Sequence, residues 1–326
     1  MLVEFTDKLR ARIIRYLGIH REMTELRDRV QRLEDALADR LGPAVDQPVL
    51  TASHAAAQLT ETIQQRLFAL QQLVTSPGAR PPGAHLAAAS LERPAVSVIL
   101  PTYNRARFVG EAIASVQAQS FPAWELVVID DGSTDATADA VAAFLGDPRI
   151  RYIHQPNAGS SAARNRGLDA TSAALVAYID SDNTWYPDFL ALAVDRLAVS
   201  PEIDFVYGAL VTFLHNLPSS CILWEPFDRA RLISGNFIDT NVVVHRRELV
   251  ARYGNWDPRL SRLNDWDFAL RCTVDKPAYA LNALAAYYRQ VDDIRLSETV
   301  DGEREQQIIQ SKLSAARIPG SNAVRF

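Results

Sequence analysis

The sequence has little cysteine and no long apolar run, and both absences limit what the protein can be. Its 326 residues contain two cysteines, Cys221 and Cys272, too few and too far apart for a disulfide framework or a zinc motif. No uninterrupted apolar run approaches the ~20 residues of a membrane span. The amino-terminal segment mixes acidic and basic residues, unlike a signal peptide. We therefore expect a cytoplasmic protein, either free or peripheral at the inner face of the membrane.

Several catalytic signatures are also missing. There is no Gly-x-x-x-x-Gly-Lys phosphate loop, no Gly-x-Gly-x-x-Gly fingerprint and no Gly-x-Ser-x-Gly elbow, and the six histidines form no His-Glu-x-x-His site. The net charge of -5 argues against general binding to nucleic acid. The hydrophobic fraction of 48% and charged fraction of 22% are ordinary for a globular protein.

The first 76 residues predict a helical region. Apolar residues recur in steps of four and three from Ile19 to Leu37, which is a heptad pattern, and a second helical stretch covers roughly 52–74. Three interpretations stay open: a helix packed on its own domain, a coiled coil that forms a homo-oligomer, and a basic amphipathic helix on an anionic membrane. Residues 77–93, with several prolines and glycines, predict a linker.

From residue 94 the pattern changes to alternating strands and helices. The expected strands are apolar runs at 96–100, 126–129, 150–154 and 175–179. The expected helices cover 108–119, 160–170 and a segment capped by Ser133 or Thr134 that ends near 145. This alternation predicts a Rossmann-like α/β fold, with a mostly parallel sheet and helices on both faces. We assign 94–300 to this domain and 301–326 to a carboxy-terminal helix or tail.

Polar segments follow each of the four strands, and parallel topology brings them to one rim of the sheet. They are Pro101-Thr102-Tyr103-Asn104, Asp130-Asp131-Gly132-Ser133, residues 155–159 and Asp180-Ser181-Asp182. Asp180 and Asp182 are two residues apart, so their carboxylates face the same way on an extended chain and suit Mg²⁺ or Mn²⁺. The alternative is that Asp182 only caps the following helix.

Four further residues have chemistry of interest. Asp131 could accept a hydrogen bond from the N–H of a pyrimidine ring, and Arg164 could pair with a phosphate or with one of the aspartates. Asp265 precedes Trp266, and a carboxylate against an indole is a candidate general base, while tryptophan is a surface on which sugars stack. The alternative is a helix start capped by Asn264 or Asp265, with Trp266 in the core.

In their order and spacing, these segments resemble the family 2 inverting glycosyltransferases, which have the GT-A nucleotide-sugar-binding fold. The matching text is "VSVILPTYNRARFVGEAIASVQAQSF", "ELVVIDDGSTDAT", "NAGSSAARNRGLDAT" and "AYIDSDNTWYPDFL", with weaker matches at "VVVHRRELVARYGNWDPRL" and "NDWDFALR". The resemblance extends from about Pro94 to Arg289 and leaves the first 90 residues outside.

The resemblance implies that a sugar moves with inversion from a nucleotide sugar, most simply a UDP-sugar, to a hydroxyl of a glycan or lipid-linked acceptor. It implies a Mg²⁺ or Mn²⁺ cofactor and a role in cell-surface polysaccharide synthesis. It implies donor binding by Pro101, Thr102, Tyr103, Asn104, Asp131, Arg164 and Asp180, metal binding by Asp182, a catalytic base at Asp265 and an acceptor side at Trp266. The chain departs from the family at Asn264, at Asn183 and after Tyr288-Arg289, where it lacks the usual histidine.

Two rival interpretations remain. "YIDSDNT" also fits the Asp-x-Asp-x-Thr motif of haloacid-dehalogenase-like phosphatases, with Asp180 as nucleophile, Asp182 as acid/base and Lys276 as phosphate partner. That motif normally follows the first strand of its domain, whereas three strands precede it here. The second rival is a scaffold that binds a nucleotide sugar without turning it over.

Overall fold

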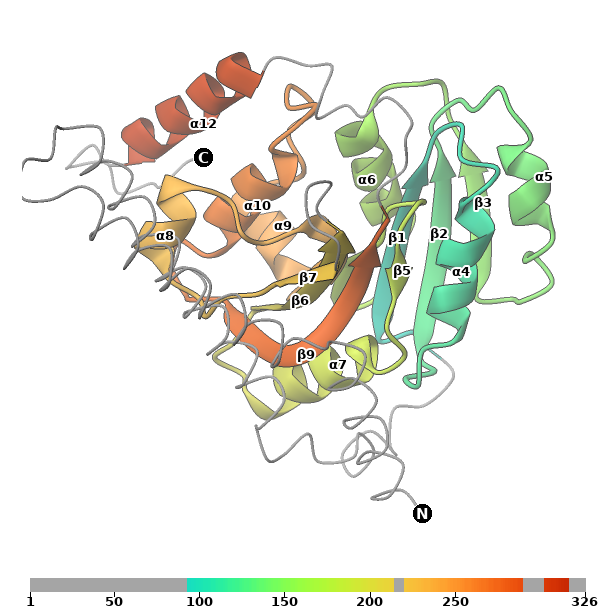
Figure 1. Ribbon diagram of the computed structural model, residues 1–326, viewed down its shortest axis with the longest axis horizontal. Helices are drawn as coiled ribbons and strands as arrows, with labels where there is room; N and C mark the ends of the chain where they lie inside the picture. The colour runs from blue at the N-terminus through green and yellow to red at the C-terminus, as the bar shows by residue number, and fades with distance from the viewer. Residues whose placement is uncertain (1–92, 214–219, 290–301, 317–326) are drawn as a thin grey trace, which may run out of the picture. The chain divides into compact units, whose positions relative to one another are not determined.

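The computed structural model describes residues 93–213, 220–289 and 302–316 (Figure 1). The predicted helical region at 1–76 and nearly all of the linker lie outside these residues, so the interpretations of that region stay predictions. Within the described part of the chain, no helix has both the length and the apolar character needed to cross a bilayer.

A nine-stranded sheet forms the centre of the described domain, in the order β3-β2-β1-β4-β8-β6-β9-β5, with β7 paired to β6. The strands are β1 (Val96–Thr102), β2 (Trp124–Asp130), β3 (Ile150–His154), β4 (Leu175–Tyr178), β5 (Thr184–Trp185), β6 (Phe205–Phe213), β7 (Ser220–Leu223), β8 (Val243–Arg246) and β9 (Tyr279–Tyr288). All four strands predicted from apolar runs are present.

The sheet is mixed, so the prediction of a mostly parallel sheet is wrong. Strands β1 to β4 pair in parallel as expected, and so do β6 and β9. The pairs β4–β8, β6–β8, β6–β7 and β5–β9 are antiparallel. Antiparallel neighbours need no helical crossover between them. The second half of the sheet is therefore built from strands, including β6 with 9 residues and β9 with 10, that the strand–helix alternation did not reveal.

Helices and loops connect the strands (Figure 1). They are α4 (Val109–Gln117), α5 (Thr137–Ala142), α6 (Ser160–Asp169), α7 (Phe189–Val199), α8 (Arg229–Ser234), the 3₁₀ turn η1 (Thr240–Val242), α9 (Glu248–Tyr253), α10 (Asn264–Cys272) and α12 (Gly302–Ala316). Helix α5 is shorter than predicted, and neither Ser133 nor Thr134 caps it, because its first turn follows Ala136 without a side-chain cap. The Ser133 hydroxyl instead accepts the N–H of Asn104, which joins two loops.

The central strands are packed on both faces. Every residue of β1 is buried, as expected for a strand packed on both sides. Helix α6 packs on β1 and β2. A Cβ at Gly167 of α6 would lie 2.5 Å from a side-chain carbon of Ile99, so glycine lets the helix come this close to β1. This close packing holds α6, which carries Arg164, against β1.

Candidate active site

The four polar segments meet at one edge of the sheet, as predicted. The register pairs Thr102 with Asp130 and Asp130 with His154, so strands β1, β2 and β3 end together. Asp180 lies two residues after the end of β4, and β4 is the other neighbour of β1. The parallel half of the fold therefore brings the predicted donor-binding residues into a single rim.

Asp131 is buried and holds the loop between β3 and α6. Its carboxylate accepts hydrogen bonds from the Gln155 amide at 2.7 Å and from the backbone N–H groups of Ala158 at 2.9 Å and Gly159 at 2.8 Å. The next residue, Gly132, has a φ of 83°, and a Cβ there would lie 2.9 Å from the backbone nitrogen of Asn157. Glycine therefore permits the tight turn at this position. The Asp131 carboxylate thus holds the loop before α6, a structural role that the sequence did not show.

The residues at the end of β1 and just after it differ in exposure and in their contacts. Tyr103 is 46% exposed, so its ring is available to a ligand. Asn104 has a left-handed φ of 52°, a conformation that asparagine tolerates. Its side-chain oxygen accepts the N–H of Thr134 at 2.8 Å, so this side chain serves the loop after β2. Thr102 is buried, and its hydroxyl has no hydrogen-bond partner among the described residues.

Arg164 and Asp180 form a partly buried ion pair at the rim. The Arg164 Nη2 donates to Asp180 Oδ1 at 2.8 Å, and the guanidinium lies over the Trp256 ring, 4.8 Å from its centroid. The arginine side chain is only 6% exposed. Its Nε and Nη1 have no hydrogen-bond partner within the described residues. A buried cation with unused donors is suited to bind an anion, because an unsatisfied buried charged donor is costly.

Asp182, the predicted metal ligand, lies beside two arginines. Arg105 Nε lies 3.4 Å from Asp182 Oδ2, and Arg289 follows β9 nearby, paired with Glu111. Burial, and then the negative charge of Asp180, raise the pKa of Asp182, whereas Arg105 acts to lower it. Asp182 does not cap α7, whose N-cap position is Asp188. The carboxylate is thus held in an environment that favours an additional cation.

Asp265 lies in the first turn of α10 and is partly buried. Its Oδ2 accepts from the Asn236 amide at 2.9 Å, and its Oδ1 accepts from the backbone N–H of Trp266 at 2.8 Å. Burial raises the pKa of Asp265, opposed by that backbone hydrogen bond and by the charge of Arg164. A small cavity touches the carboxylate, and its other walls are Phe205, Ile238, Thr240, Val243, Trp256, Phe268 and Ala269.

Trp266 lies in the core and not on a surface open to a sugar. Its side chain is 3% exposed, and the indole N–H donates to the carbonyl of Leu232 at 2.6 Å. The acceptor-side stacking predicted for Trp266 is therefore wrong for this structure, and the alternative of a core residue holds. The predicted caps also differ, because Leu263 precedes the first turn of α10 with a left-handed φ of 54°.

Two departures from the family pattern have structural tasks. Asn264 donates through Nδ2 to the hydroxyls of Ser161 at 3.2 Å and Ser160 at 3.3 Å, which ties α10 to the start of α6. Asn183 accepts the backbone N–H of Arg289 at 3.0 Å, which ties the turn after β4 to the end of β9. Asn264 thus connects two helices, and Asn183 connects the rim to the second half of the sheet.

Sequence reasoning missed Asp239 and Asn241. Asn241 is fully buried and bridges two carboxylates, since its Nδ2 donates to Asp180 Oδ2 at 3.0 Å and to Asp239 Oδ1 at 2.8 Å. Its own Oδ1 accepts the backbone N–H of Asp180 at 2.7 Å. The only sequence signal was an Asp-x-Asn directly before the apolar residues of β8. Asp239 adds a third carboxylate to the corner that contains Asp180 and Asp265.

Asp239 should make stability depend on pH. Burial, and then the charges of Asp265 and Asp180, raise the pKa of Asp239 from 3.8 to about 7. The folded state then binds this proton more tightly than the unfolded state, so the free energy of unfolding should fall as pH rises towards 7. Asp239→Asn keeps the acceptor for Asn241 and removes the charge. We expect the melting temperature of the variant, relative to the wild type, to increase from pH 5 to pH 8, and parallel curves would contradict this.

Comparison with known proteins places the chain in a family. The model of glycosyl transferase family 2 matches residues 97–241. A PGL/p-HBAD biosynthesis glycosyltransferase of Mycobacterium bovis is 32% identical over 184 residues, which are 55% of this chain and 70% of that protein. A putative teichuronic acid biosynthesis glycosyltransferase of Bacillus subtilis, TuaG, is 39% identical over 100 residues, covering 30% of this chain and 40% of that protein.

Other relatives share only part of their length with this chain. An uncharacterized glycosyltransferase of Rickettsia felis is 39% identical over 113 residues, which are 35% of this chain and 18% of that protein. An uncharacterized glycosyltransferase of Nostoc sp. is 32% identical over 206 residues, covering 60% of this chain and 64% of that protein.

Two solved structures have the same fold as the described domain. S. aureus TarS 1-349 in complex with UDP-GlcNAc has a TM-score of 0.60 and 20% identity, covering 70% of this chain and 67% of that chain. The mannosyltransferase PcManGT from Pyrobaculum calidifontis, in complex with GDP-Man and Mn²⁺, has a TM-score of 0.55 and 22% identity, covering 84% and 75%. At these identities the likeness shows the fold alone.

The chain belongs to glycosyl transferase family 2, which confirms the predicted family. The phosphatase alternative fails for a structural reason as well. Lys276, its proposed phosphate partner, pairs with Asp204 at 2.8 Å, and Asp204 also pairs with Arg246, which lies opposite Leu175 at the start of β4. Lys276 therefore lies at the end of β4 away from Asp180.

Proposed function

We propose that this protein is an inverting glycosyltransferase that transfers a sugar from a UDP-sugar to an acceptor hydroxyl, with Asp265 as general base. The observation that carries the proposal is Arg164, a buried cation paired with Asp180 at the rim, whose Nε and Nη1 find no partner in the part of the chain that the structure describes. Arg105 and Arg289 add positive charge near Asp182. Together these groups are suited to a ligand with two phosphates.

The donor would bind across the rim. The exposed ring of Tyr103 offers a surface on which a nucleobase can stack. Asp131 has one hydrogen bond on Oδ2 and two on Oδ1, so it retains acceptor capacity for the N–H of a uracil. Pro101 and Thr102 complete the predicted nucleoside side. Asp180 and Arg164 lie between that side and Asp265.

The reaction is a single displacement. Asp265 takes the proton of the acceptor hydroxyl while its oxygen attacks the anomeric carbon, and the bond from that carbon to the diphosphate oxygen breaks with its electron pair. A raised pKa suits a general base, because the base must both accept a proton and be ionised near neutral pH. Asn236 and the Trp266 N–H hold the two carboxylate oxygens in place.

The chain's residues fit a divalent metal that arrives with the donor. Among the described residues no group of three or more acidic, histidine or cysteine side chains could hold a metal ion, so Asp182 would contribute one ligand and the diphosphate others. When bound, Mg²⁺ or Mn²⁺ supplies positive charge that stabilises the leaving diphosphate. Arg105, which now pairs with Asp182, would be free to turn to a phosphate.

Asp182→Ala should abolish the metal dependence of donor binding. We expect Mn²⁺ to raise the melting temperature of the wild type with a nucleotide sugar, because a ligand that binds only the folded state stabilises it. The variant should lose the increment due to Mn²⁺ and keep any increment due to the nucleotide alone. A thermal-shift screen of UDP-GlcNAc, UDP-glucose and GDP-mannose, with and without Mn²⁺, measures this, with the exposed Glu202→Gln as control. An equal Mn²⁺ increment in Asp182→Ala would contradict the assignment.

The relatives suggest the setting of the reaction. Their names refer to teichuronic acid biosynthesis and to PGL/p-HBAD biosynthesis. We propose a glycan or lipid-linked acceptor in cell-surface polysaccharide synthesis, at the cytoplasmic side of the membrane. Residues 1–76 would then form a homo-oligomer or contact the membrane surface.

The second candidate is a scaffold that binds the nucleotide sugar without catalysis. The absence of the usual histidine after Arg289 is the observation that favours it. Release of nucleoside diphosphate from the bound donor in the presence of Mn²⁺ would argue against it.

A further inference from the structure

Helix α12 binds the loop that leads to Asp265. Glu305 of this helix is 4% exposed, and its carboxylate accepts three hydrogen bonds from the loop. Oε1 accepts from the N–H of Ser261 at 2.9 Å and from its hydroxyl at 2.6 Å, and Oε2 accepts from the N–H of Arg262 at 2.7 Å. The carboxylate therefore fixes the backbone of two successive residues.

The next residue in the chain is strained. Leu263 has a left-handed φ of 54°, which is unfavourable for a residue other than glycine and persists only when its surroundings enforce it. Glu305 holds the two residues before Leu263. Asn264, the residue after it, is held by Ser160 and Ser161 of α6. Asp265 follows at once, so its position depends on both sets of hydrogen bonds.

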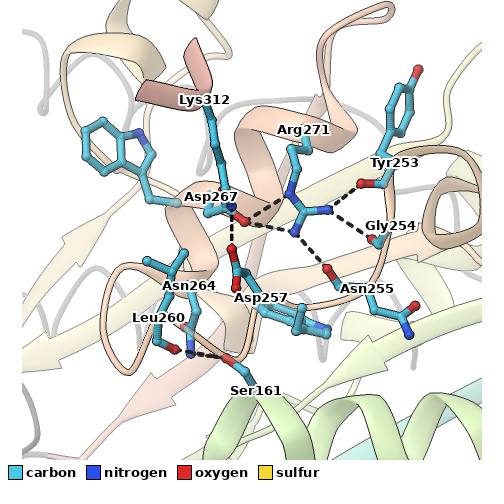
Figure 2. Close-up of polar contacts among 12 residues, drawn as sticks. Ser161, Tyr253, Gly254, Asn255, Asp257, Leu260, Asn264, Asp267, Arg271 and Lys312 are labelled. Carbon is cyan, nitrogen blue, oxygen red and sulfur yellow. Dashed lines mark hydrogen bonds and ion pairs between the residues drawn. The ribbon is translucent and has the colours of Figure 1, made fainter. Parts of the chain in front are cut away.

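A second charged contact fixes α12 to the same region (Figure 2). Lys312 Nζ lies 2.5 Å from Asp267 Oδ1 and 2.9 Å from Asp257 Oδ2, and both acids are buried. Ile309 and Leu313 of the same helix are buried in the core. Spacings of three and four residues put these side chains and Glu305 on one face of the helix.

The loop of residues 257–264 is thus held from two sides. On the side of α6, the Ser161 hydroxyl donates to the carbonyl of Leu260 at 3.1 Å (Figure 2). On the other side are Glu305 and Lys312. Within the described residues, no hydrogen bond or ion pair joins Tyr103 or Asp131 to α12, and none joins Asp182 to it.

We infer that Glu305 is a positioning residue, which acts through the loop at 257–264 to set where the Asp265 carboxylate meets the acceptor. This inference rests on the proposed function of Asp265. On this inference, α12 contributes to the transfer step, whereas donor binding does not depend on α12. The segment predicted as a carboxy-terminal helix or tail would then be required for turnover.

The test compares Glu305→Ala with the wild type and with Gln306→Ala, an exposed position on the same helix. Loss of three hydrogen bonds should speed amide hydrogen exchange at 261–266 roughly tenfold, while the amides of β1 stay unchanged. With the donor that binds best in the thermal-shift screen, Mn²⁺-dependent release of nucleoside diphosphate per donor-binding site should fall about 10- to 100-fold. The dissociation constant of that donor should change less than twofold.

Two further variants keep the outcome decisive. Ser261→Ala removes one hydrogen-bond donor to Glu305 and leaves the buried carboxylate in place, so it serves as the test if Glu305→Ala does not fold. We expect it to speed amide hydrogen exchange at 261–266 by less than the tenfold expected for Glu305→Ala. Unchanged exchange at 261–266, or faster exchange with unchanged turnover, would overturn the inference. Normal turnover in Asp265→Asn would instead overturn the proposed base, whatever the result for Glu305. A purely structural role for Glu305 would lower the number of donor-binding sites and leave turnover per site unchanged.

Discussion

Asp265→Asn is expected to lower turnover by about 10²–10⁴-fold, the usual contribution of a general base. Asparagine has nearly the shape of aspartate and can still accept the backbone N–H of Trp266, so α10 should keep its structure, although the hydrogen bond from Asn236 is lost. It cannot take a proton from an acceptor hydroxyl. Donor binding should stay within about twofold, because Asp265 would act on the acceptor.

The measurement is release of nucleoside diphosphate with Mn²⁺, together with the dissociation constant of the donor. Asp169→Asn, at the exposed end of α6, is the matched control and should behave like the wild type. Near-normal turnover in Asp265→Asn with intact donor binding would show that another group is the base. Asp239 would then be the first group to test, because it belongs to the same cluster of carboxylates.

Arg271→Leu is expected to destabilise the fold by about 3–5 kcal/mol, the typical cost of leaving one member of a buried ion pair alone. Figure 2 shows the reason. Arg271 pairs with Asp267 at 2.9 Å, and both side chains are almost fully buried. Its other nitrogens donate to the carbonyls of Tyr253, Gly254 and Asn255 at distances from 2.7 to 3.0 Å.

Chemical denaturation followed by tryptophan fluorescence would measure the loss of stability. Arg259→Leu is the control, since this arginine also pairs with a buried acid, Asp257, but is itself 68% exposed. The exposed pair should contribute about 0–1 kcal/mol. Equal effects of the two substitutions would contradict the view that burial makes Arg271 important. A smaller effect at Arg271 would mean that Lys312 alone can neutralise Asp267.

The first half of the fold could be predicted because its strands are continuous apolar runs. Those of β1, β2 and β4 are buried nearly throughout, and this burial is what produces such runs. In the second half of the fold, the strands are less clearly marked by apolar runs in the sequence. Strand β8 contains the buried His245, and β5 has only two residues. The antiparallel pairing that makes the sheet mixed depends on contacts between residues far apart in sequence.

The same division applies to the site. Asp131, Asp180 and Asp182 could be placed because parallel strands end at one edge of the sheet. Asn241 and Glu305 could not, since the former is 61 residues from Asp180 and the latter is 44 residues from Ser261. No local pattern reveals such partners. The burial of Trp266 was equally hidden, because an amphipathic helix start and a sugar-stacking tryptophan look the same in sequence.

The position of Asn241 has a consequence for how two substrates would be handled in turn. The amide of Asn241 donates to Asp180, on the proposed nucleotide side, and to Asp239, whose pKa is raised by the nearby charge of Asp265, the proposed base. Any displacement of Asp180 by an incoming ligand must therefore stretch or break hydrogen bonds, each contributing about 1 kcal/mol, that also orient η1. If the donor binds at Asp180 as proposed, its binding would therefore disturb the hydrogen bonds next to Asp265, and this coupling would favour a fixed order of binding for the two substrates.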